Sequence, residues 1–303
     1  MNGIHPMKSP LFAITLGALG IFLPLSGIAE PTGNETWEFL DNGKIRIGVN
    51  RNAGAAIGWF SESGREENIL NRFDYGRYVQ QSWYGKRDDS DWNGKPWRWN
   101  PVQGGNWTGL GARLSEFASE KNLLTASTVP RHWASGEEIT DVEFTQKIQL
   151  DGDIAIIDFT MRYSGEETHP IHDQELPAVF VDARYSRLHY LHPEDQGGDP
   201  PRVAEPAFPN ERLKIREPWI AWLDKDDRGI GVLVPDIELN TVTCYRTAGD
   251  PNNRNKGACS YAAPIKRIAV TPAFEFQYRA YLTIGTLAEI RHRFHKIQTD
   301  KKP

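Results

Sequence analysis

The chain has 303 residues, of which 40 are acidic and 35 are basic, so its formal net charge is −5 at neutral pH. The basic residues are scattered among the acidic ones. We therefore expect no nucleic-acid partner, because no basic surface is available to neutralise phosphates.

The N-terminal segment has the features of a secretory signal peptide. Lys8 precedes an apolar stretch without charge from Leu11 to Leu25, and Gly27 and Ala29 are small residues placed for cleavage after residue 29. We predict that residues 1–29 are removed, that the protein is secreted or periplasmic, and that no membrane span remains in the mature chain. A retained membrane anchor is the alternative. Residues 30–303 contain no linker-like break and are expected to form one domain.

Short segments rich in β-branched and aromatic residues recur along the chain and predict strands. Turn residues that tolerate positive φ separate several of them, for example at 41–43, 151–153 and 226–229. The predicted strands are Lys44–Asn50, Ala55–Ser61, Arg77–Tyr84, Asn122–Thr128, Thr140–Leu150, Ile154–Tyr163, Ala178–Ala183, Trp219–Leu223, Gly229–Val234, Thr241–Arg246, Arg267–Thr271 and Phe274–Ile284.

Helical periodicity begins only at Thr286, where a Thr cap is followed three residues later by Glu289. Strands without intervening helices indicate an antiparallel sheet, because parallel strands need long crossovers. The predicted fold is all-β, a large antiparallel β-sandwich of the supersandwich or jelly-roll type with one short C-terminal helix. A closed barrel is the alternative. Two segments, Lys86–Gly111 and His192–Pro218, are expected to be long loops that carry function.

The segment Asp74–Trp107 contains five of the ten tryptophans together with Arg, Asn, Gln and Asp. Such a mixture suits carbohydrate, since a sugar ring stacks on aromatic faces and its hydroxyls bind paired donors and acceptors. The alternatives are a solvent-facing edge strand at 77–84 and a tight turn at 100–105 that caps itself. The predicted substrate-binding residues are Arg77, Gln80, Trp83, Trp97, Trp99, Asn100 and Gln103.

Asp89, Asp91 and Asn93, followed by Gly94, match the opening of a calcium loop, in which alternate oxygen ligands face one cation. Asn100 stands at the twelfth position, where an EF-hand has Glu. We expect no required cofactor, and we retain calcium as a candidate ligand beside the alternative of a solvated acidic turn.

The segment 169–177 is the densest group of titratable residues. His172, Glu175 and Tyr84 are the predicted catalytic residues, although a His and a Glu three residues apart on a strand point to opposite faces unless a bulge intervenes. Glu175 as a buried structural acid is the alternative. Tyr245 and Tyr261 are candidates for additional groups in the same groove.

Cys244 and Cys259 are the only cysteines of the chain. In an exported protein, an even number of cysteines close in sequence predicts a disulfide. Two free buried thiols are the alternative.

Five segments carry a resemblance to a known family: GRYVQQSWYG, WNPVQGGNW, HDQELPAVFVDA, WIAWLDKDDRGIGVLVPD and YLTIGTLAEIRHRF. In this order they resemble exported bacterial proteins of the galactose-mutarotase-like supersandwich type, which are found among carbohydrate-active proteins. Mutarotases use a His and a Glu at the sugar ring, and no motif of this chain matches that pair. The resemblance therefore implies a fold and a ligand class rather than catalytic residues.

The sequence favours an exported enzyme that cleaves glycosidic bonds of a polysaccharide. A hydrolase would pair Glu175 with Asp182, Glu205 or Asp74, whereas a lyase would use Arg77, Tyr84 and His172 on a uronic acid. The alternative is a carbohydrate-binding protein or a sugar epimerase of the same fold, which makes no cut. A structural protein of the cell envelope is a third interpretation.

Overall fold

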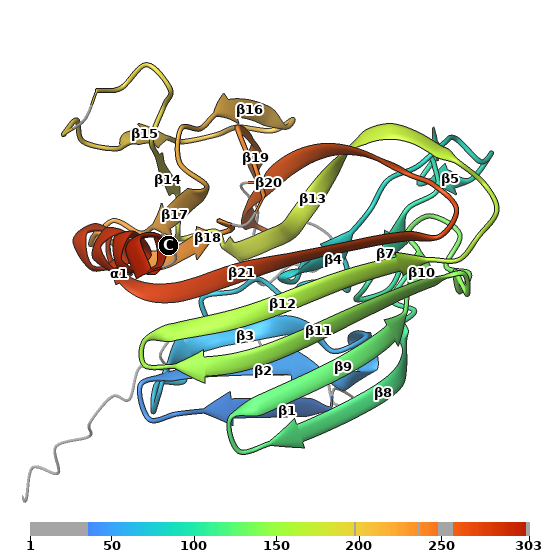
Figure 1. Cartoon of the computed structure of the whole chain (residues 1–303), viewed down its shortest axis with the longest axis horizontal. Helices are drawn as coiled ribbons and strands as arrows, with labels where there is room; N and C mark the ends of the chain where they lie inside the picture. Colours follow the sequence, from blue (N-terminus) through green and yellow to red (C-terminus); the bar gives the residue numbers. More distant parts are fainter. Residues whose placement is uncertain (1–35, 197, 236, 248–256, 301–303) are drawn as a thin grey trace, which may run out of the picture. The chain divides into compact units, whose positions relative to one another are not determined.

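Two large antiparallel sheets enclose the main hydrophobic core of the chain (Figure 1). The structure is a computed structural model that describes residues 36–196, 198–235, 237–247 and 257–300. The predicted signal peptide, residues 1–29, lies outside the described residues. Within those residues, no helix is both long and apolar enough to cross a bilayer.

The first large sheet has nine strands in the order β15-β14-β17-β18-β21-β12-β11-β9-β8. Long hairpins build its centre, and the β11–β12 hairpin turns at Gly152, whose φ is +55°. The strands are β8 (Arg113–Glu120), β9 (Leu123–Val129), β11 (Val142–Asp151), β12 (Ile154–Tyr163), β14 (Arg187–Tyr190), β15 (Arg202–Ala204), β17 (Trp219–Leu223), β18 (Arg228–Leu233) and β21 (Phe274–Thr286).

The second large sheet has seven strands in the order β10-β7-β4-β13-β20-β19-β16. The long strand β13 lies at its centre, between β4 and β20. The strands are β4 (Gln80–Ser82), β7 (Pro101–Val102), β10 (Arg131–His132), β13 (His169–Asp182), β16 (Glu211–Lys214), β19 (Thr241–Thr247) and β20 (Cys259–Val270).

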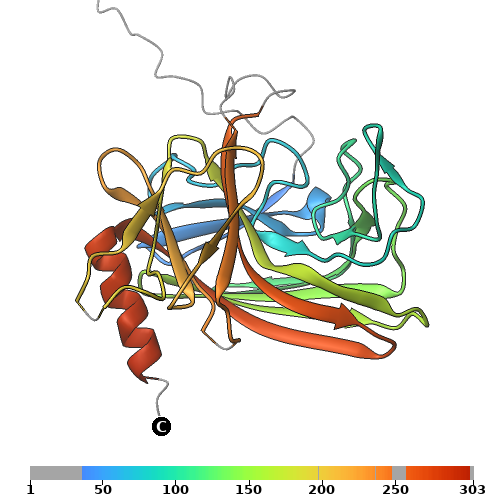
Figure 2. The same ribbon diagram turned by 90° about the horizontal axis from the view of Figure 1, so that it is seen from above.

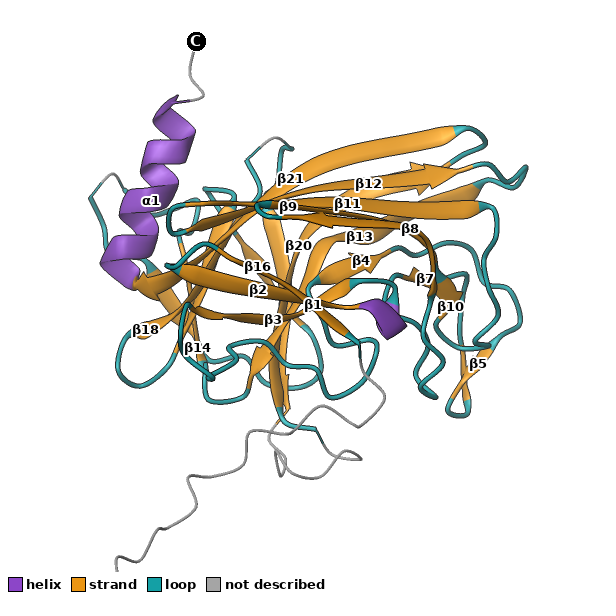
Figure 3. Cartoon of the chain, turned by 90° about the horizontal axis from the view of Figure 1, so that it is seen from below, coloured by secondary structure: helices purple, strands orange, loops and turns teal. Residues whose placement is uncertain are grey.

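Two smaller sheets complete the β-structure. A three-stranded sheet consists of β1 (Trp37–Asp41), β2 (Ile45–Asn50) and β3 (Ala56–Glu62), and the short 3-10 helix η1 (Arg51–Ala53) joins β2 to β3. The hairpin of β5 (Asp91–Trp92) and β6 (Lys95–Pro96) lies at the end of the molecule opposite the C-terminal helix (Figure 3).

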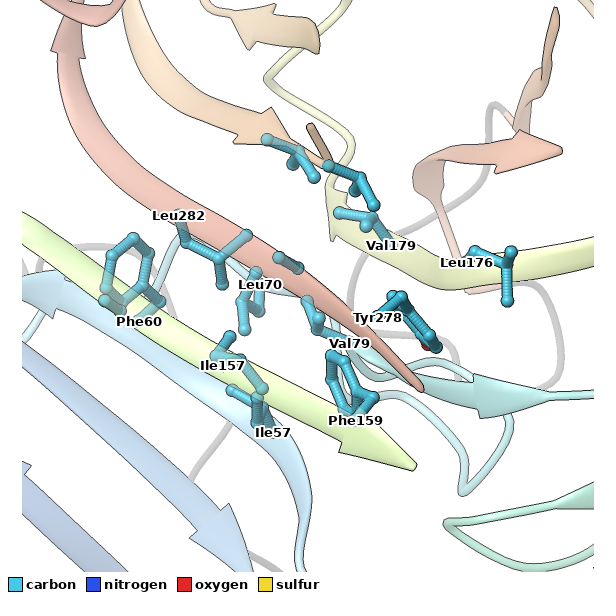
Figure 4. Close-up of a cluster of buried hydrophobic side chains, with 14 of the residues drawn as sticks. Ile57, Phe60, Leu70, Val79, Ile157, Phe159, Leu176, Val179, Tyr278 and Leu282 are labelled. Atoms are coloured by element: carbon cyan, nitrogen blue, oxygen red, sulfur yellow. The ribbon is translucent and has the colours of Figure 1, made fainter. Parts of the chain in front are cut away.

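The main core lies between the inner faces of the two large sheets and β3 (Figure 4). On β12, Ile157, Phe159 and Met161 alternate with residues of the outer face and are fully buried, as the period of two in a strand requires. The ring of Phe159 stacks on that of Tyr278 with their centroids 5.1 Å apart. Val179 on β13 closes the same core from the second sheet.

Helix α1 (Leu287–Asp300, red in Figure 2) packs on strands β17, β18 and β21 of the nine-stranded sheet. Its N-terminus carries the predicted cap, because the Glu289 carboxylate accepts hydrogen bonds from the Thr286 amide and hydroxyl. Ile290 and Phe294 are buried against Trp219 and other residues of β17, β18 and β21. The predicted all-β sandwich with one C-terminal helix is therefore confirmed.

Most predicted strands are present, and two of them, β12 and β17, have the predicted bounds. The main differences lie in the seven-stranded sheet. There β13 begins at His169 rather than Ala178, and β20 begins at Cys259 rather than Arg267. Their additional residues mix polar and aromatic side chains with apolar ones, because one face of this sheet is turned away from the main core and carries a separate cluster.

Candidate functional site

Glu175 lies in the middle of the seven-stranded sheet, on the face turned away from the main core. It is paired with Ser82 on β4 and with Ile265 on β20. Directly paired residues of antiparallel strands point to the same side, so Glu175 shares its face with Ile265 and, by alternation along β20, with Tyr261. The side chain is half-buried and remains accessible to solvent.

Three hydroxyl groups surround the Glu175 carboxylate. The Tyr261 hydroxyl donates a hydrogen bond to Glu175 Oε1, and Tyr84 and Ser82 hydrogen-bond to the same carboxylate. Burial raises the pKa of Glu175 to about 7, and the three hydrogen bonds oppose that rise. Near neutral pH this carboxyl group therefore gains and loses a proton readily, as a general acid or base must.

An aromatic wall adjoins Glu175. Phe180, Tyr261 and Tyr245 lie directly opposite one another on β13, β20 and β19, and the centroid distances are 4.6 Å for Phe180–Tyr261 and 4.8 Å for Tyr261–Tyr245. Phe208 continues the row at 5.7 Å from Tyr245 and is 68% exposed. Burial raises the pKa of Tyr84, Tyr245 and Tyr261, so all three hydroxyls remain protonated at neutral pH.

Arg77, a predicted substrate-binding residue, lies beside this wall. Its guanidinium pairs with the Asp74 carboxylate at 3.1 Å and donates to the Gly257 carbonyl at 2.6 Å. Nη1 of Arg77 also lies 3.8 Å from Sγ of Cys259, which belongs to the same apolar cluster as Phe180 and Tyr261. Its polar contacts indicate that Arg77 supports the wall.

His172 contacts Arg98 rather than Glu175. Nη1 of Arg98 lies 3.1 Å from Nε2 and 3.2 Å from Nδ1 of His172. Burial, and then the charges of Arg98 and Arg267, lower the pKa of His172, so its ring is neutral at neutral pH. Within the described residues, the hydrogen bonds of the Glu175 carboxylate go to Tyr261, Tyr84 and Ser82.

Four predicted substrate-binding residues are inaccessible to a ligand, so that part of the prediction is wrong. Gln80 and Trp83 are fully buried, and Asn100 and Gln103 are each 1% exposed. The side-chain amide of Gln103 donates to the Gly54 carbonyl at 3.2 Å and to Gln146 at 2.9 Å, whereas the buried indole nitrogen of Trp83 has no hydrogen-bond partner among the described residues. The polar residues around 80 and 103 thus form a buried network that joins the β4–β7 region to η1 and β11.

The remaining two predicted binding residues are tryptophans with different surroundings. Trp99 is 9% exposed and stacks on His169 with their centroids 3.9 Å apart, which makes it a core residue. Trp97 is half-buried and packs on Trp92, with centroids 4.7 Å apart, and its indole nitrogen donates to Asn100. Trp97 therefore belongs to a tryptophan cluster at the β5–β6 hairpin.

The predicted calcium residues lie in and beside the β5–β6 hairpin. The Asp91 carboxylate accepts a hydrogen bond of 2.6 Å from the Gly94 amide, and Asp89 and Asn93 have positive φ angles of 62° and 51°. These are features of a self-capped turn. Across the described part of the chain, no three His, Cys, Asp or Glu side chains come together as they would around a metal ion.

The predicted disulfide is absent, and both cysteines are free and buried. In the register of β19 and β20, Cys244 is opposite Ala262 and Cys259 is opposite Thr247. Cys244 therefore faces the main core, whereas Cys259 belongs to the cluster on the opposite face. Two cysteines on opposite faces of a sheet cannot be bridged without moving the backbone.

Solved structures share this architecture at low sequence identity. A putative aldose 1-epimerase from Escherichia coli superimposes with a TM-score of 0.51 and 13% identity, over 84% of this chain and 100% of that chain. A galactose mutarotase related enzyme from Lactobacillus acidophilus gives 0.51 and 12%, over 83% and 98% of the two chains. The galactosidase domain of an α-galactosidase–sucrose kinase gives 0.50 and 9%, over 84% and 41%.

No protein-family model matches the chain, and no curated protein matches its sequence. The structural matches confirm the resemblance in fold: this protein has the galactose-mutarotase-like fold, which occurs in an epimerase-like enzyme and in a galactosidase domain.

The sequence alone predicts the site only in part. Glu175 and Tyr84 were predicted and are neighbours in the structure. Tyr261 and Tyr245 were noted only as additional groups, and Phe180 and Phe208 were missed. The row of Phe180, Tyr261 and Tyr245 depends on the register of β13, β20 and β19, and the one available signal is the aromatic residue in each of these strands. Phe208 lies before β16 and joins the row only through its contact with Tyr245.

Proposed function

We propose that this protein is a carbohydrate-active enzyme that transfers protons at a sugar ring without cutting a glycosidic bond, as in the interconversion of anomers. The observation that supports the proposal is the half-buried Glu175 carboxyl, which has a pKa of about 7 beside an aromatic wall. The mutarotase-like fold points to the same chemistry.

Anomer interconversion requires little more than one base and one proton donor. The base removes the proton from the anomeric hydroxyl, the bond between C1 and the ring oxygen breaks, and the ring oxygen receives a proton. Rotation about C1–C2 and the reverse steps give the other anomer. Ionised Glu175 is the base in this proposal, and the protonated hydroxyl of Tyr84 is the neighbouring group that can donate to the ring oxygen.

The aromatic wall would hold the sugar during these steps. Tyr245 is half-buried and Phe208 is exposed, in a row of rings that reaches Glu175 through Tyr261, and the C–H face of a pyranose can stack on such rings. Tyr261 has a separate role: its hydroxyl donates to the carboxylate and stabilises the ionised form.

Cleavage of a polysaccharide, the interpretation favoured by the sequence, has weaker support. A hydrolase needs a second carboxyl group about 5–10 Å from the first. Asp74 is paired with Arg77, Asp182 accepts from the Arg184 amide at 3.0 Å, and Glu205 lies exposed after β15. Two residues that a lyase would use are also bound to other side chains, since Arg77 pairs with Asp74 and His172 contacts Arg98.

Product analysis distinguishes these reactions. The purified protein would be incubated with fresh α-anomers of aldoses and uronic acids, and with neutral and acidic polysaccharides. Proton NMR would follow the anomeric signals, while reducing ends and ultraviolet absorbance of unsaturated uronides would report cleavage. The proposal expects accelerated anomer interconversion without new reducing ends. New reducing ends, with or without the ultraviolet signal, would contradict it.

Three further elements of the proposal come from the sequence. The N-terminal pattern supports secretion or a periplasmic location. Proton transfer by Glu175 needs no cofactor, and calcium remains a candidate ligand of the 89–93 turn. The partner would be a sugar or an oligosaccharide, with no nucleic acid involved.

A further inference from the structure

Three tryptophans pack together at the edge of the seven-stranded sheet that carries the β5–β6 hairpin. The ring of Trp92 lies 4.7 Å from that of Trp97 and 6.0 Å from that of Trp133, measured between centroids. All three side chains are half-buried, so part of each ring is open to solvent. Figures 1 and 3 show this hairpin at the end of the sheet formed by β7 and β10. We call Trp92, Trp97 and Trp133 the tryptophan cluster.

A chain of hydrogen bonds connects the tryptophan cluster to the Glu175 carboxylate. The indole nitrogen of Trp97 donates to Oδ1 of Asn100 at 3.2 Å. Nδ2 of Asn100 donates to Oγ of Ser82 at 3.2 Å. Ser82 is directly opposite Glu175 in the sheet and hydrogen-bonds to its carboxylate. Trp97 therefore lies over the same face of the sheet as Glu175.

Tyr84, the proposed proton donor, lies between Glu175 and the tryptophan cluster. The backbone amides on either side of Tyr84 donate to the carbonyls on either side of Asn100, so these two residues lie directly opposite each other. Two strand spacings, from β13 across β4 to the segment before β7, amount to about 10 Å. A short oligosaccharide can span this distance.

Glu175 has aromatic surface on both sides. In the order of the sheet, β20 and β19 carry the aromatic wall on one side of β13, whereas β4, β7 and β10 lead to the tryptophan cluster on the other side. Gly76 packs on the ring of Trp133, since an added Cβ atom would lie 2.4 Å from that ring. The next residue, Arg77, lies beside the aromatic wall. Aromatic surface therefore continues past the Glu175 carboxyl in both directions across the strands.

Two contacts hold the tryptophan cluster against the sheet. Nε2 of His132 on β10 lies 2.8 Å from Oδ2 of Asp88, in the segment that leads into the β5–β6 hairpin. The Trp133 amide donates to the Asn100 carbonyl at 2.9 Å. An aromatic surface that is already fixed in place loses little conformational entropy when a ligand binds, so it suits the recognition of a sugar ring.

We propose that the tryptophan cluster binds a second sugar ring, so that the substrate is an oligosaccharide whose reducing end lies at Glu175. This inference rests on the proposed function of Glu175. Interconversion of anomers needs a free anomeric hydroxyl, and the reducing end of an oligosaccharide has one. The aromatic wall holds that terminal ring in the proposed function, so the next ring of the chain would stack on Trp92 and Trp97.

The test compares monosaccharides with matched disaccharides. The panel consists of glucose with cellobiose and maltose, galactose with galactobiose, and xylose with xylobiose. Calorimetry would measure the affinities, and exchange NMR of the anomeric signals would measure interconversion of the reducing ends. In at least one series, the wild type is expected to bind the disaccharide about three- to tenfold more tightly than the monosaccharide. Methyl glycosides of the same disaccharides should bind without being interconverted, because they lack a free anomeric hydroxyl.

Three variants and one control assign the preference to the tryptophan cluster. Trp92→Ala and Trp97→Ala should each lower the ratio of disaccharide to monosaccharide affinity toward one. Trp97→Phe keeps an aromatic ring and should retain part of the preference. Trp59→Ala is the control, because it removes a half-buried tryptophan of β3 that packs on Phe39 of β1, and it should leave the ratio unchanged. Thermal unfolding would verify that each variant is folded.

The two proposals can fail separately. Equal affinity for disaccharides and monosaccharides in every series, no binding by any member of the panel, or a preference unchanged in both alanine variants would overturn the oligosaccharide inference. Glu175-dependent interconversion with equal affinities would keep the proposed function and reject this inference. A preference for disaccharides that depends on Trp92 and Trp97, without interconversion of any sugar, would keep the second sugar site and reject the proposed function.

Discussion

The Tyr261 hydroxyl on β20 donates a hydrogen bond to the Glu175 carboxylate on the neighbouring strand β13. This contact joins the aromatic wall to a carboxyl group whose pKa is raised to about 7. Burial favours the neutral acid and the hydrogen bond favours the ionised base, so their balance keeps the group titratable near neutral pH.

The pKa of Glu175 predicts how stability depends on pH. The pKa is 4.5 for an ordinary Glu and about 7 in the folded protein, so the folded state binds the proton more tightly. The resulting stability is fully present below about pH 4.5 and is lost as the pH rises through 7. Relative to Glu175→Gln, the free energy of unfolding should fall by about 3 kcal/mol between pH 4 and pH 8. Denaturant titrations of the wild type and of Glu175→Gln would measure the free energy of unfolding at each pH. If the two proteins showed the same dependence on pH, the prediction would be contradicted.

Removal of the Tyr261 hydroxyl should raise the pKa of Glu175 further. The hydrogen bond stabilises the ionised carboxylate, so Tyr261→Phe favours the neutral form. The carbon-13 shift of the labelled Glu175 carboxyl, followed against pH, would report the change. Tyr163→Phe is the control, because it removes a hydroxyl that donates to the Glu167 carbonyl at 3.1 Å. An equal or lower pKa in Tyr261→Phe would show that this bond does not set the titration.

Gln103→Ala should destabilise the protein by about 2–4 kcal/mol. The substitution leaves the Gln81 amide, the Gly54 carbonyl and the Gln146 side chain without one partner each and opens a buried cavity. Gln149→Ala, on the exposed face of β11, is the matched control and should change stability little. Equal unfolding midpoints in urea for the two variants would contradict the structural role of the network.

Phe208→Ala tests the aromatic wall. Phe208 is 68% exposed, so its loss should leave stability nearly unchanged, whereas sugar binding should weaken about three- to tenfold. Leu110→Ala, which removes another exposed apolar side chain, should not affect binding. Calorimetry would measure the affinity of the wild type and of both variants for one sugar. Equal affinities in the two variants would exclude Phe208 from the binding surface.

Both cysteines should be free thiols. Alkylation of the denatured protein without reductant is expected to modify Cys244 and Cys259 in every molecule, as mass spectrometry would show. Burial raises the pKa of Cys244 to about 12, so its reaction in the folded state should be slow. A cross-linked peptide containing both residues would contradict the register of β19 and β20.

The sequence predicted the fold well where burial follows a local pattern. The alternation in β12 arises because one face of this strand meets the main core, and the apolar run of β17 arises because both of its faces are buried, one in the main core and one in the cluster under α1. The predicted bounds of both strands agree with the structure. Capping at Thr286 is equally local. For such elements, the neighbouring residues contain the information that determines the structure.

The site was less predictable, because its properties depend on contacts between distant segments. Gln80 and Gln103 have polar side chains, and only the tertiary arrangement shows that backbone groups satisfy them in the interior. Phe180, Tyr261 and Tyr245 form a row only because β13, β20 and β19 pair in a particular register. That register also separates Cys244 from Cys259, which their spacing in sequence does not reveal.

The most direct test of the central claim is the rate of anomer interconversion, measured by proton NMR for the wild type, Glu175→Gln and Glu137→Gln. Glu137 is exposed after β10, so its variant controls for the loss of one carboxylate. We predict that the wild type and Glu137→Gln accelerate interconversion of at least one sugar, whereas Glu175→Gln leaves the rate at that of buffer. Equal acceleration by Glu175→Gln would contradict the assignment of Glu175 as the proton-transfer group.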